Sequence, residues 1–215
     1  MHKPMKDTVR EITEDRRGAL VVFENGEALW FSRAVWREHE TIAIGAEEDV
    51  DELKAWLLPR QYPEALNYAV SLLAARARSS GEIRQKLRLR RYMDDTIEMV
   101  EYKLEKEKLL DDKAFAREWA ASCARRQMGK SRIVQELRRK GISQELCGQA
   151  LEELDGDEGD AAAVALAAKL LRRYGNETDQ RKAMGKLLAA MARRGYGYEE
   201  ARRAVEAALD EMEEP

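Results

Sequence analysis

The fold of this chain is decided by the stretch Lys130-Ser131-Arg132-Ile133-Val134-Gln135-Glu136-Leu137-Arg138-Arg139-Lys140-Gly141-Ile142. If it is a helix, Ile133 and Leu137 share one face, because residues four apart lie one above the other. The four basic residues at 132 and 138–140 then lie mostly off this apolar face. Gly141 is typical of helix ends, since glycine adopts positive φ without a Cβ penalty. The stretch therefore predicts a short basic helix with a defined end, after which Ile142 folds back onto the apolar face.

The same pattern recurs at two fixed offsets. Fifty residues earlier, the matching positions are Ile83, Leu87 and Tyr92. Fifty-four residues later, they are Leu187, Met191, Gly195 and Tyr196. Self-similarity at a nearly constant period indicates stacked structural repeats. We therefore expect a mostly α fold, an elongated array of three tandem three-helix repeats that resemble helix-turn-helix units, preceded by a small N-terminal β-hairpin and helix region.

The expected repeats span residues 63–107, 108–156 and 157–215, after an N-terminal region at 1–62. A unit of this size buries little apolar surface by itself, so we expect neighbouring repeats to pack together. In the first repeat we expect helices at 64–75, 79–90 and 94–106, and the next helix at 111–126. Ser79 and Glu82 fit a capping box, and Asp94 and Asp111 are expected to cap the following helices. The acidic run 155–160 is the expected flexible joint.

The first 60 residues have a different pattern. Two apolar runs, at 18–23 and 28–31, flank an Asn-Gly pair, which predicts a hairpin because both turn residues accept positive φ. Residues 9–12 are expected to add a third strand, Ser32 to cap a short helix ending at Trp36, and 47–58 to form a helix. Pro59 and Pro63 are expected to mark the boundary with the repeats.

Composition favours a protein of the cytoplasm. No apolar run approaches the roughly 20 residues that cross a bilayer, and the first residues lack the apolar core of a signal peptide. The two cysteines are isolated, which suits a reducing compartment. We expect no membrane association.

Charge is strongly segregated although the net charge is only −3. Residues 76–91 and 125–140 each hold seven basic residues and one acid, whereas 152–160 holds six acids and no base. A charge run is usually a solvated helix face, but here the excess recurs in successive repeats, which favours an anion-binding stripe. The anion would be a nucleic-acid backbone or an acidic protein groove. The candidate binding residues are Arg84, Lys86, Arg88, Arg90, Arg125, Arg126, Lys130, Arg132, Arg138, Arg139 and Lys140.

Other chemistry is poorly supported by the sequence. Gly129-Lys130-Ser131 resembles the end of a phosphate-binding loop, but Ala124 stands where the first glycine should be and a helix, not a strand, precedes it. The acidic run lacks the spacing of a calcium loop. Cys123 and Cys147 fall at helical core positions. We expect no catalytic residue, no metal and no cofactor.

The sequence resembles the RecX family of recombinase regulators. The resemblance is carried by Tyr68-Ala69, Ser79-x-x-Glu82-Ile83-x-x-Lys86-Leu87, Leu109-Leu110-Asp111-Asp112-x-x-Phe115-Ala116 and Gly129-x-x-Arg132-Ile133-x-x-Glu136-Leu137-x-x-Lys140-Gly141-Ile142. It is best from about 64 to 154, and the third repeat keeps mainly Gly195-Tyr196 and the apolar spacing. The family often has glycine before the aromatic residue that ends the first repeat's second helix. Here Arg91 precedes Tyr92, so we expect a less tight turn.

The resemblance implies a non-enzymatic regulator of the RecA recombinase in DNA recombination and repair. RecX proteins bind the RecA–DNA filament and usually limit its extension, ATP hydrolysis and strand exchange. The expected partners are thus the RecA filament and, weakly and in a salt-dependent way, single-stranded DNA, with the chain acting as a monomer.

A second interpretation is a stand-alone DNA-binding repeat protein whose helix-turn-helix units enter a groove. Readout of base edges needs suitable polar side chains on the recognition helix. The candidate helix at 94–106 carries Glu98, Glu101 and Glu105, which argues against entry into a groove. The two interpretations differ in whether tight binding requires RecA.

Overall fold

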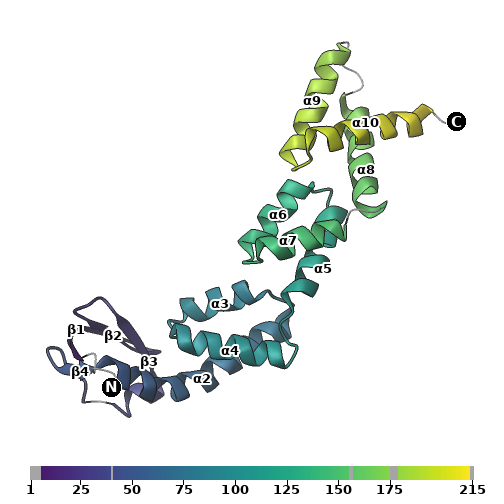
Figure 1. Cartoon of the computed structure of the whole chain (residues 1–215). Coiled ribbons are helices and arrows are strands. Elements are labelled where there is room, and N and C mark those ends of the chain that lie inside the picture. Colours follow the sequence, from purple (N-terminus) through teal and green to yellow (C-terminus); the bar gives the residue numbers. More distant parts are fainter. Residues whose placement is uncertain (1–5, 40, 155–156, 175–178, 214–215) are drawn as a thin grey trace. The chain divides into compact units, whose positions relative to one another are not determined.

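A computed structural model of the chain describes residues 6–39, 41–154, 157–174 and 179–213 (Figure 1). The chain divides into two compact units, Met1–Leu110 and Asp111–Pro215. The described residues confirm a mostly α fold with a small N-terminal β region. Their elements are β1 (Lys6–Asp15), β2 (Gly18–Phe23), β3 (Ala28–Ser32), α1 (Arg33–Trp36), β4 (Glu47–Asp49), α2 (Val50–Ala75), α3 (Ser80–Leu89), α4 (Asp94–Lys106), α5 (Asp112–Arg125), α6 (Lys130–Arg139), α7 (Gln144–Glu152), α8 (Asp157–Tyr174), α9 (Gln180–Arg193) and α10 (Tyr198–Glu213).

The N-terminal strands form an antiparallel sheet in the order β3-β2-β1-β4. The predicted hairpin is confirmed as β2 and β3, and the third strand is longer than expected. The turn differs from the two-residue type that Asn-Gly favours. Gly26 has φ 89°, Asn25 does not have positive φ, and the Phe23 N–H donates to the Glu27 carbonyl at 2.8 Å. These features match a three-residue hairpin loop in which only the last residue needs glycine.

The prediction that Pro59 and Pro63 separate two helices is wrong, because α2 runs unbroken through both prolines. Residues 47–49 form β4 instead of the first turn of that helix, and the Asp49 carboxylate caps α2 by accepting from the Asp51 and Glu52 amides. Both prolines lie on the exposed side of α2. On that side water can satisfy the carbonyl groups that lose their helical partners, so the prolines are tolerated.

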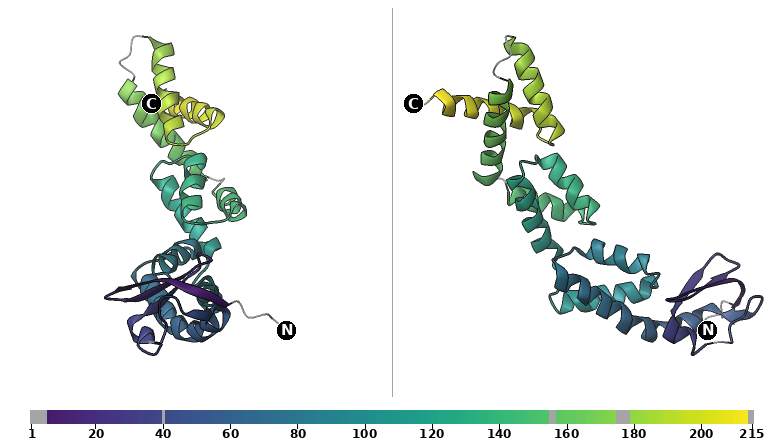
Figure 2. Two further views of the ribbon diagram at one scale, coloured as in Figure 1. Left: turned by 90° about the vertical axis from the view of Figure 1, so that its left-hand side faces the viewer. Right: turned by 180° about the vertical axis from the view of Figure 1, so that it is seen from behind.

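Helix α2 takes part in two cores. Its N-terminal half packs Val50, Leu53 and Leu57 against the sheet, and its C-terminal half packs Ala65 and Ala69 against α3 and α4. Figure 2 shows the strands beside the N-terminal half of this helix.

The four residue ranges that we predicted for the N-terminal region and for the three repeats remain predictions.

A buried amide fastens the sheet to the first helical core. Gln61 of α2 is only 1% exposed. Its side-chain nitrogen donates to the Trp30 carbonyl of β3 at 2.7 Å. Its side-chain oxygen accepts from the Met93 amide at 3.1 Å and from the Thr96 hydroxyl at 3.0 Å, at the start of α4. The amide thus has partners at both ends, as a buried polar group requires.

The repeated apolar pair is confirmed in all three places. Each pair is buried in a separate core, with exposures of 3% or less: Ile83 and Leu87 on α3, Ile133 and Leu137 on α6, Leu187 and Met191 on α9. The residues that fold back after these helices, Tyr92, Ile142 and Tyr196, are buried as well.

The same left-handed turn follows each of the three helices. Gly141 has φ 81° and Gly195 has φ 92°. Arg91 has φ 64°, so the expectation of a less tight first turn is wrong: the arginine adopts the conformation that glycine adopts in the other two. A side chain in this region is disfavoured by contact between Cβ and the backbone.

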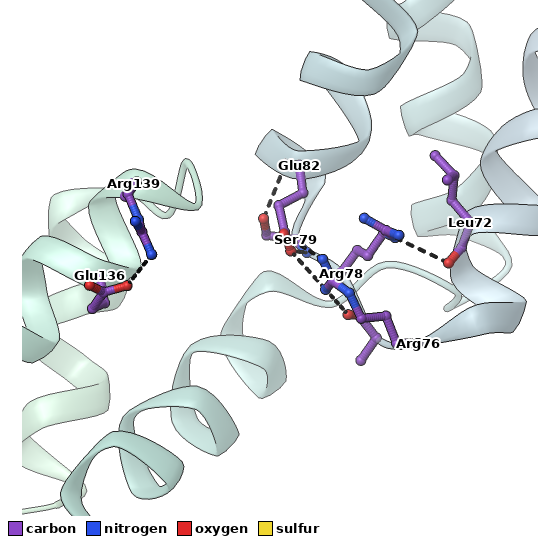
Figure 3. A network of polar contacts seen from close by, with 8 residues as sticks. Leu72, Arg76, Arg78, Ser79, Glu82, Glu136 and Arg139 are labelled. Carbon is purple, nitrogen blue, oxygen red and sulfur yellow. Dashed lines mark hydrogen bonds and ion pairs between the residues drawn. The ribbon is translucent and has the colours of Figure 1, made fainter. Parts of the chain in front are cut away.

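The caps agree with the sequence in part. Ser79 and Glu82 form the predicted capping box of α3 (Figure 3), and Asp111 caps α5 by accepting from the Ala114 amide at 2.8 Å. Asp94 is the first residue of α4, not its cap, and its carboxylate accepts from Arg88. Ser32 stands at the cap position of α1, but its hydroxyl donates to the Glu64 carboxylate at 2.8 Å.

The expected joint at 155–160 is helical from residue 157 onward, and residues 155 and 156 lie outside the described part. Among the described residues, no helix combines the length and apolar character needed to span a membrane.

We predict that Arg91→Gly stabilises the protein. Removing Cβ relieves the left-handed strain, which exceeds the entropy that glycine adds to the unfolded chain, so the free energy of unfolding should rise by about 0.5–1 kcal/mol. Urea unfolding measures this change. The control is Leu89→Gly at the exposed end of α3, which should lower stability by about 1 kcal/mol. A loss of stability in Arg91→Gly would contradict the argument.

A second prediction concerns the buried pair on α6. Leu137 is 0% exposed, so Leu137→Ala should lower the free energy of unfolding by about 2–5 kcal/mol through lost burial and a cavity. Thermal unfolding of this variant is to be compared with Leu89→Ala, whose side chain is 67% exposed and should matter little. Equal effects of the two substitutions would contradict the assigned core.

Candidate functional site

The candidate cations belong to two short helices and their flanking turns. Arg84, Lys86 and Arg88 lie on α3 with Arg90 at its end, and Lys130, Arg132, Arg138 and Arg139 lie on α6 with Lys140 at its end. Arg125 and Arg126 end α5. Lys86 and Lys140 are half-buried and the other nine are exposed. In both helices the buried pair commits one face to the core, which leaves the basic side chains on the remaining surface. The two groups lie in different units, so one continuous stripe stays a prediction.

Arg84 is held by a carboxylate of its own domain. Its Nε donates to Glu101 Oε1 at 2.9 Å, and its Nη2 pairs with Glu101 Oε2. The Glu101 side chain is 8% exposed and that of Arg84 is 45% exposed. The hydrogen bonds from Glu101 raise the pKa of the Arg84 guanidinium, against desolvation that lowers it. Arg84 therefore neutralises a buried charge, and it is less suited than the other candidates to bind a ligand.

Three further arginines make ion pairs at the surface. Arg88 Nε lies 3.0 Å from Asp94, Arg139 lies 2.6 Å from Glu136 (Figure 3), and Arg132 lies 3.7 Å from the same glutamate. The Arg88–Asp94 pair is exposed on both sides, and such pairs contribute about 0–1 kcal/mol, so Arg88 can exchange its carboxylate for a phosphate at little cost. Glu136 is only 15% exposed, but Arg132 and Arg139 share it, so either arginine can turn to a ligand while the other stays paired.

The sequence did not reveal that two candidate cations stack on aromatic rings. The Arg90 guanidinium lies 3.8 Å from the centre of the Tyr68 ring, and Lys140 Nζ lies 3.9 Å from that of Trp119. Trp119 is itself stacked on Phe115. Tyr68 and Trp119 stand 51 residues apart on the first helices of two successive repeats. This near match to the repeat period was the signal that could have exposed the contact.

Arg126 also contacts Trp119, with 5.5 Å between the guanidinium and the ring centre. Arg138 donates to the Gln144 side chain at 2.8 Å. Lys86 and Arg125 form no hydrogen bond or ion pair with any described residue. The candidate set thus divides into cations that hold the fold and cations that remain available to a ligand, and Arg138, Lys86 and Arg125 belong to the second group.

The segment Gly129-Lys130-Ser131 is a turn that leads into α6. This is the structure expected if the segment does not bind phosphate. The Gly129 amide donates to the Arg194 carbonyl at 2.9 Å, and the Ser131 amide donates to the Gly195 carbonyl at 3.2 Å. These amides are therefore not directed at a phosphate. Among the described residues no cluster of His, Cys, Asp or Glu could hold a metal ion.

Both cysteines are fully buried, which confirms the expected core positions. Burial raises the pKa of the Cys123 and Cys147 thiols, so both are protonated and unreactive near neutral pH.

Comparison with known proteins covers these helices. The profile of the first RecX three-helix domain matches residues 65–100, the second matches 111–151 and the third matches 157–205. Regulatory protein RecX of Amycolatopsis mediterranei is 36% identical over 137 residues, which cover 63% of this chain and 78% of the relative. Regulatory protein RecX of Prosthecochloris aestuarii is 35% identical over 150 residues, covering 69% and 93%.

A crystal structure of regulatory protein RecX has a TM-score of 0.63 and 22% identity, and the match covers 95% of this chain and 99% of that one. At this sequence identity the similarity of the two structures shows a shared fold and nothing more. The fold and the basic helices define a protein built of tandem three-helix domains. The three matched domains and the named relatives show that the chain belongs to the RecX family of regulatory proteins.

We predict that Arg84 is required for stability. Arg84→Ala would leave the Glu101 carboxylate buried without its partner and should lower the free energy of unfolding by about 1–2 kcal/mol. We expect a loss of only this size because about half of the arginine side chain is in solvent. Lys86→Ala on the same helix should stay within about 0.5 kcal/mol. Urea unfolding compares the two variants. Equal small effects would return Arg84 to the set of available cations.

Proposed function

We propose that this protein binds the filament that RecA forms on single-stranded DNA and limits RecA's ATP hydrolysis, filament extension and strand exchange. Membership of a family of regulatory proteins supports the regulatory role, and the resemblance of the sequence to RecX proteins supports RecA as the partner. The protein acts by binding, as a monomer, and needs no cofactor.

One observation carries the proposal: a basic helix with a committed apolar face recurs in two successive domains, α3 and α6. Contacts repeated along a chain gain most from a target that is itself repetitive, because each contact raises the effective concentration of the next. A filament of protein and DNA is such a target, whereas a free RecA protomer offers a single contact. The arginines that are held only by surface pairs are the ones that we propose meet phosphate or carboxylate groups of the filament.

The acidity of α4 favours this function over stand-alone DNA binding. Glu98 and Glu105 are exposed on the helix that would have to enter a groove. Phosphate groups would repel these side chains, whereas a protein surface can accept them. The direct test is RecA ATP hydrolysis on single-stranded DNA with and without the protein. Inhibition at near-stoichiometric amounts is expected, and a protein that leaves hydrolysis unchanged would refute the proposed function.

We predict that Arg138→Glu with Arg139→Glu weakens inhibition at least several-fold. The exchange removes two cations and adds repulsion from a polyanion, while the exposed positions leave stability nearly unchanged. The measurement is RecA ATP hydrolysis together with thermal unfolding of the same preparation. The matched control is Arg202→Glu with Arg203→Glu on α10. It makes the same charge change on exposed residues, one of which, Arg202, holds a surface pair as Arg139 does.

The control should inhibit like the unchanged protein. Unchanged inhibition by a folded Arg138/Arg139 variant would remove these residues from the binding surface. Equal loss in both variants would show that net charge alone matters.

Free DNA should bind weakly and with strong salt dependence. Counterion release drives such binding, so the logarithm of affinity should fall by about 0.7 per phosphate contact for each tenfold rise in salt on a single strand. Fluorescence anisotropy with a labelled oligonucleotide measures the slope, with and without RecA. Tight, sequence-specific binding to duplex DNA at high salt and without RecA would support the alternative function instead.

A further inference from the structure

The start of α6 is built differently from the start of α3. In α3, Ser79 and Glu82 cap the helix with their own side chains. Fifty residues later the same positions hold Gly129 and Arg132, and neither supplies such a cap. A helix start leaves several backbone N–H groups without helical partners, and these need acceptors from elsewhere.

Residues after α9 supply the missing acceptors. The Arg194 carbonyl accepts from the Gly129 amide at 2.9 Å, and the Gly195 carbonyl accepts from the Ser131 amide at 3.2 Å. The negative end of one helix dipole thus meets the positive end of another, which is a favourable arrangement. Both helices belong to the same compact unit.

The two backbones approach too closely for any side chain. A Cβ at Gly129 would lie 2.3 Å from the Gly195 carbonyl carbon and 2.3 Å from the Tyr196 nitrogen. A Cβ at Gly195 would lie 2.5 Å from the Cβ of Arg132. Contacts below 3.0 Å are essentially never made by Cβ atoms. Glycine is therefore required at 129 although its φ of −77° is open to every residue.

We propose that Gly129 and Gly195 form an inter-domain clasp, in which the turn after α9 completes the cap of α6 and fixes Lys130 and Arg132 relative to the third helical domain. The two residues flank the contact directly, since Lys130 follows Gly129 and Arg132 lies against Gly195. Gly129 and Gly195 are positioning residues, because they act through the cations beside them. The effect on inhibition rests on the proposed function, whereas the clasp itself does not.

The first test measures amide hydrogen exchange by NMR in the full-length protein. The amides of residues 129 and 131 both report the clasp, because both donate to carbonyls that follow α9, and the amide of residue 132 reports a side-chain cap of α6. In Gly129→Ala both amides lose their acceptors and should exchange at least about tenfold faster. In Gly129→Ser these two amides also lose their acceptors, but the new hydroxyl can accept from the amide of residue 132, as Ser79 accepts from that of Glu82 in α3. Exchange should therefore rise at residues 129 and 131 and stay slow at residue 132.

Gly148→Ala in α7 is the matched control, because a Cβ there meets nothing within 4 Å. It should leave both amides unchanged. Slow exchange of both amides in Gly129→Ala as well would overturn the clasp.

The second test compares RecA ATP hydrolysis across the same variants. Gly129→Ser keeps a capped, folded α6 but detaches it from the third helical domain, so inhibition should weaken several-fold relative to Gly148→Ala. Faster exchange at residue 129 with inhibition equal to the control would overturn the positioning role. If the unchanged protein does not inhibit RecA, the proposed function fails while the exchange result still decides on the clasp.

Discussion

The fold depends on a pair of apolar side chains four residues apart on the second helix of each three-helix domain. The pair lies on one face and is fully withdrawn from water in all three cores, from Ile83 and Leu87 to Leu187 and Met191. Burying two such side chains contributes several kcal/mol, on the order of 1.5–3 kcal/mol each. That commitment fixes the rotation of the helix about its axis. In α3 and α6 it thereby decides which way the basic residues point, so packing and binding surface follow from the same pattern.

A basic helix can bind an anionic partner only if some of its charged side chains are not already paired within the protein. Glu101 takes up Arg84, and the rings of Tyr68 and Trp119 hold Arg90 and Lys140. These contacts brace the helices within their domains. Arg88, Arg132 and Arg139 pair with carboxylates while staying exposed themselves, and Lys86 and Arg125 form no hydrogen bond or ion pair with a described residue. Because some cations stabilise the fold and others face the solvent, such a basic helix can be held rigidly in its domain and still bind an anionic partner.

The features that the sequence predicted correctly are local ones. The capping box at Ser79 and the glycine turn at Gly141 depend on residues within one or two helical turns, where spacing alone determines the contact. The continuity of α2 could not be read in this way, because a proline breaks or spares a helix according to the face on which it lies. The turn at Arg91 shows the same limit, since the surrounding chain imposes a conformation that the residue itself disfavours.

For the candidate site, residue types identified the cations but not their partners. Arg84 and Glu101 are 17 residues apart, and Arg90 and Tyr68 are 22 apart, so each contact depends on how two helices pack. The role of Gly129 was equally hidden, because its partner lies 66 residues further along the chain.

The double use of α2 has a consequence for modularity. One helix supplies side chains to the sheet core and to the first helical core, and Gln61 bonds to both at the midpoint. A cut between the two cores leaves each with its own α2 residues, but it breaks the helix and the Gln61 hydrogen bonds that join them. The sheet and the first helical domain should therefore melt in a single cooperative step. Evolution could lengthen such a protein by adding domains at its C-terminal end far more readily than by exchanging its N-terminal one.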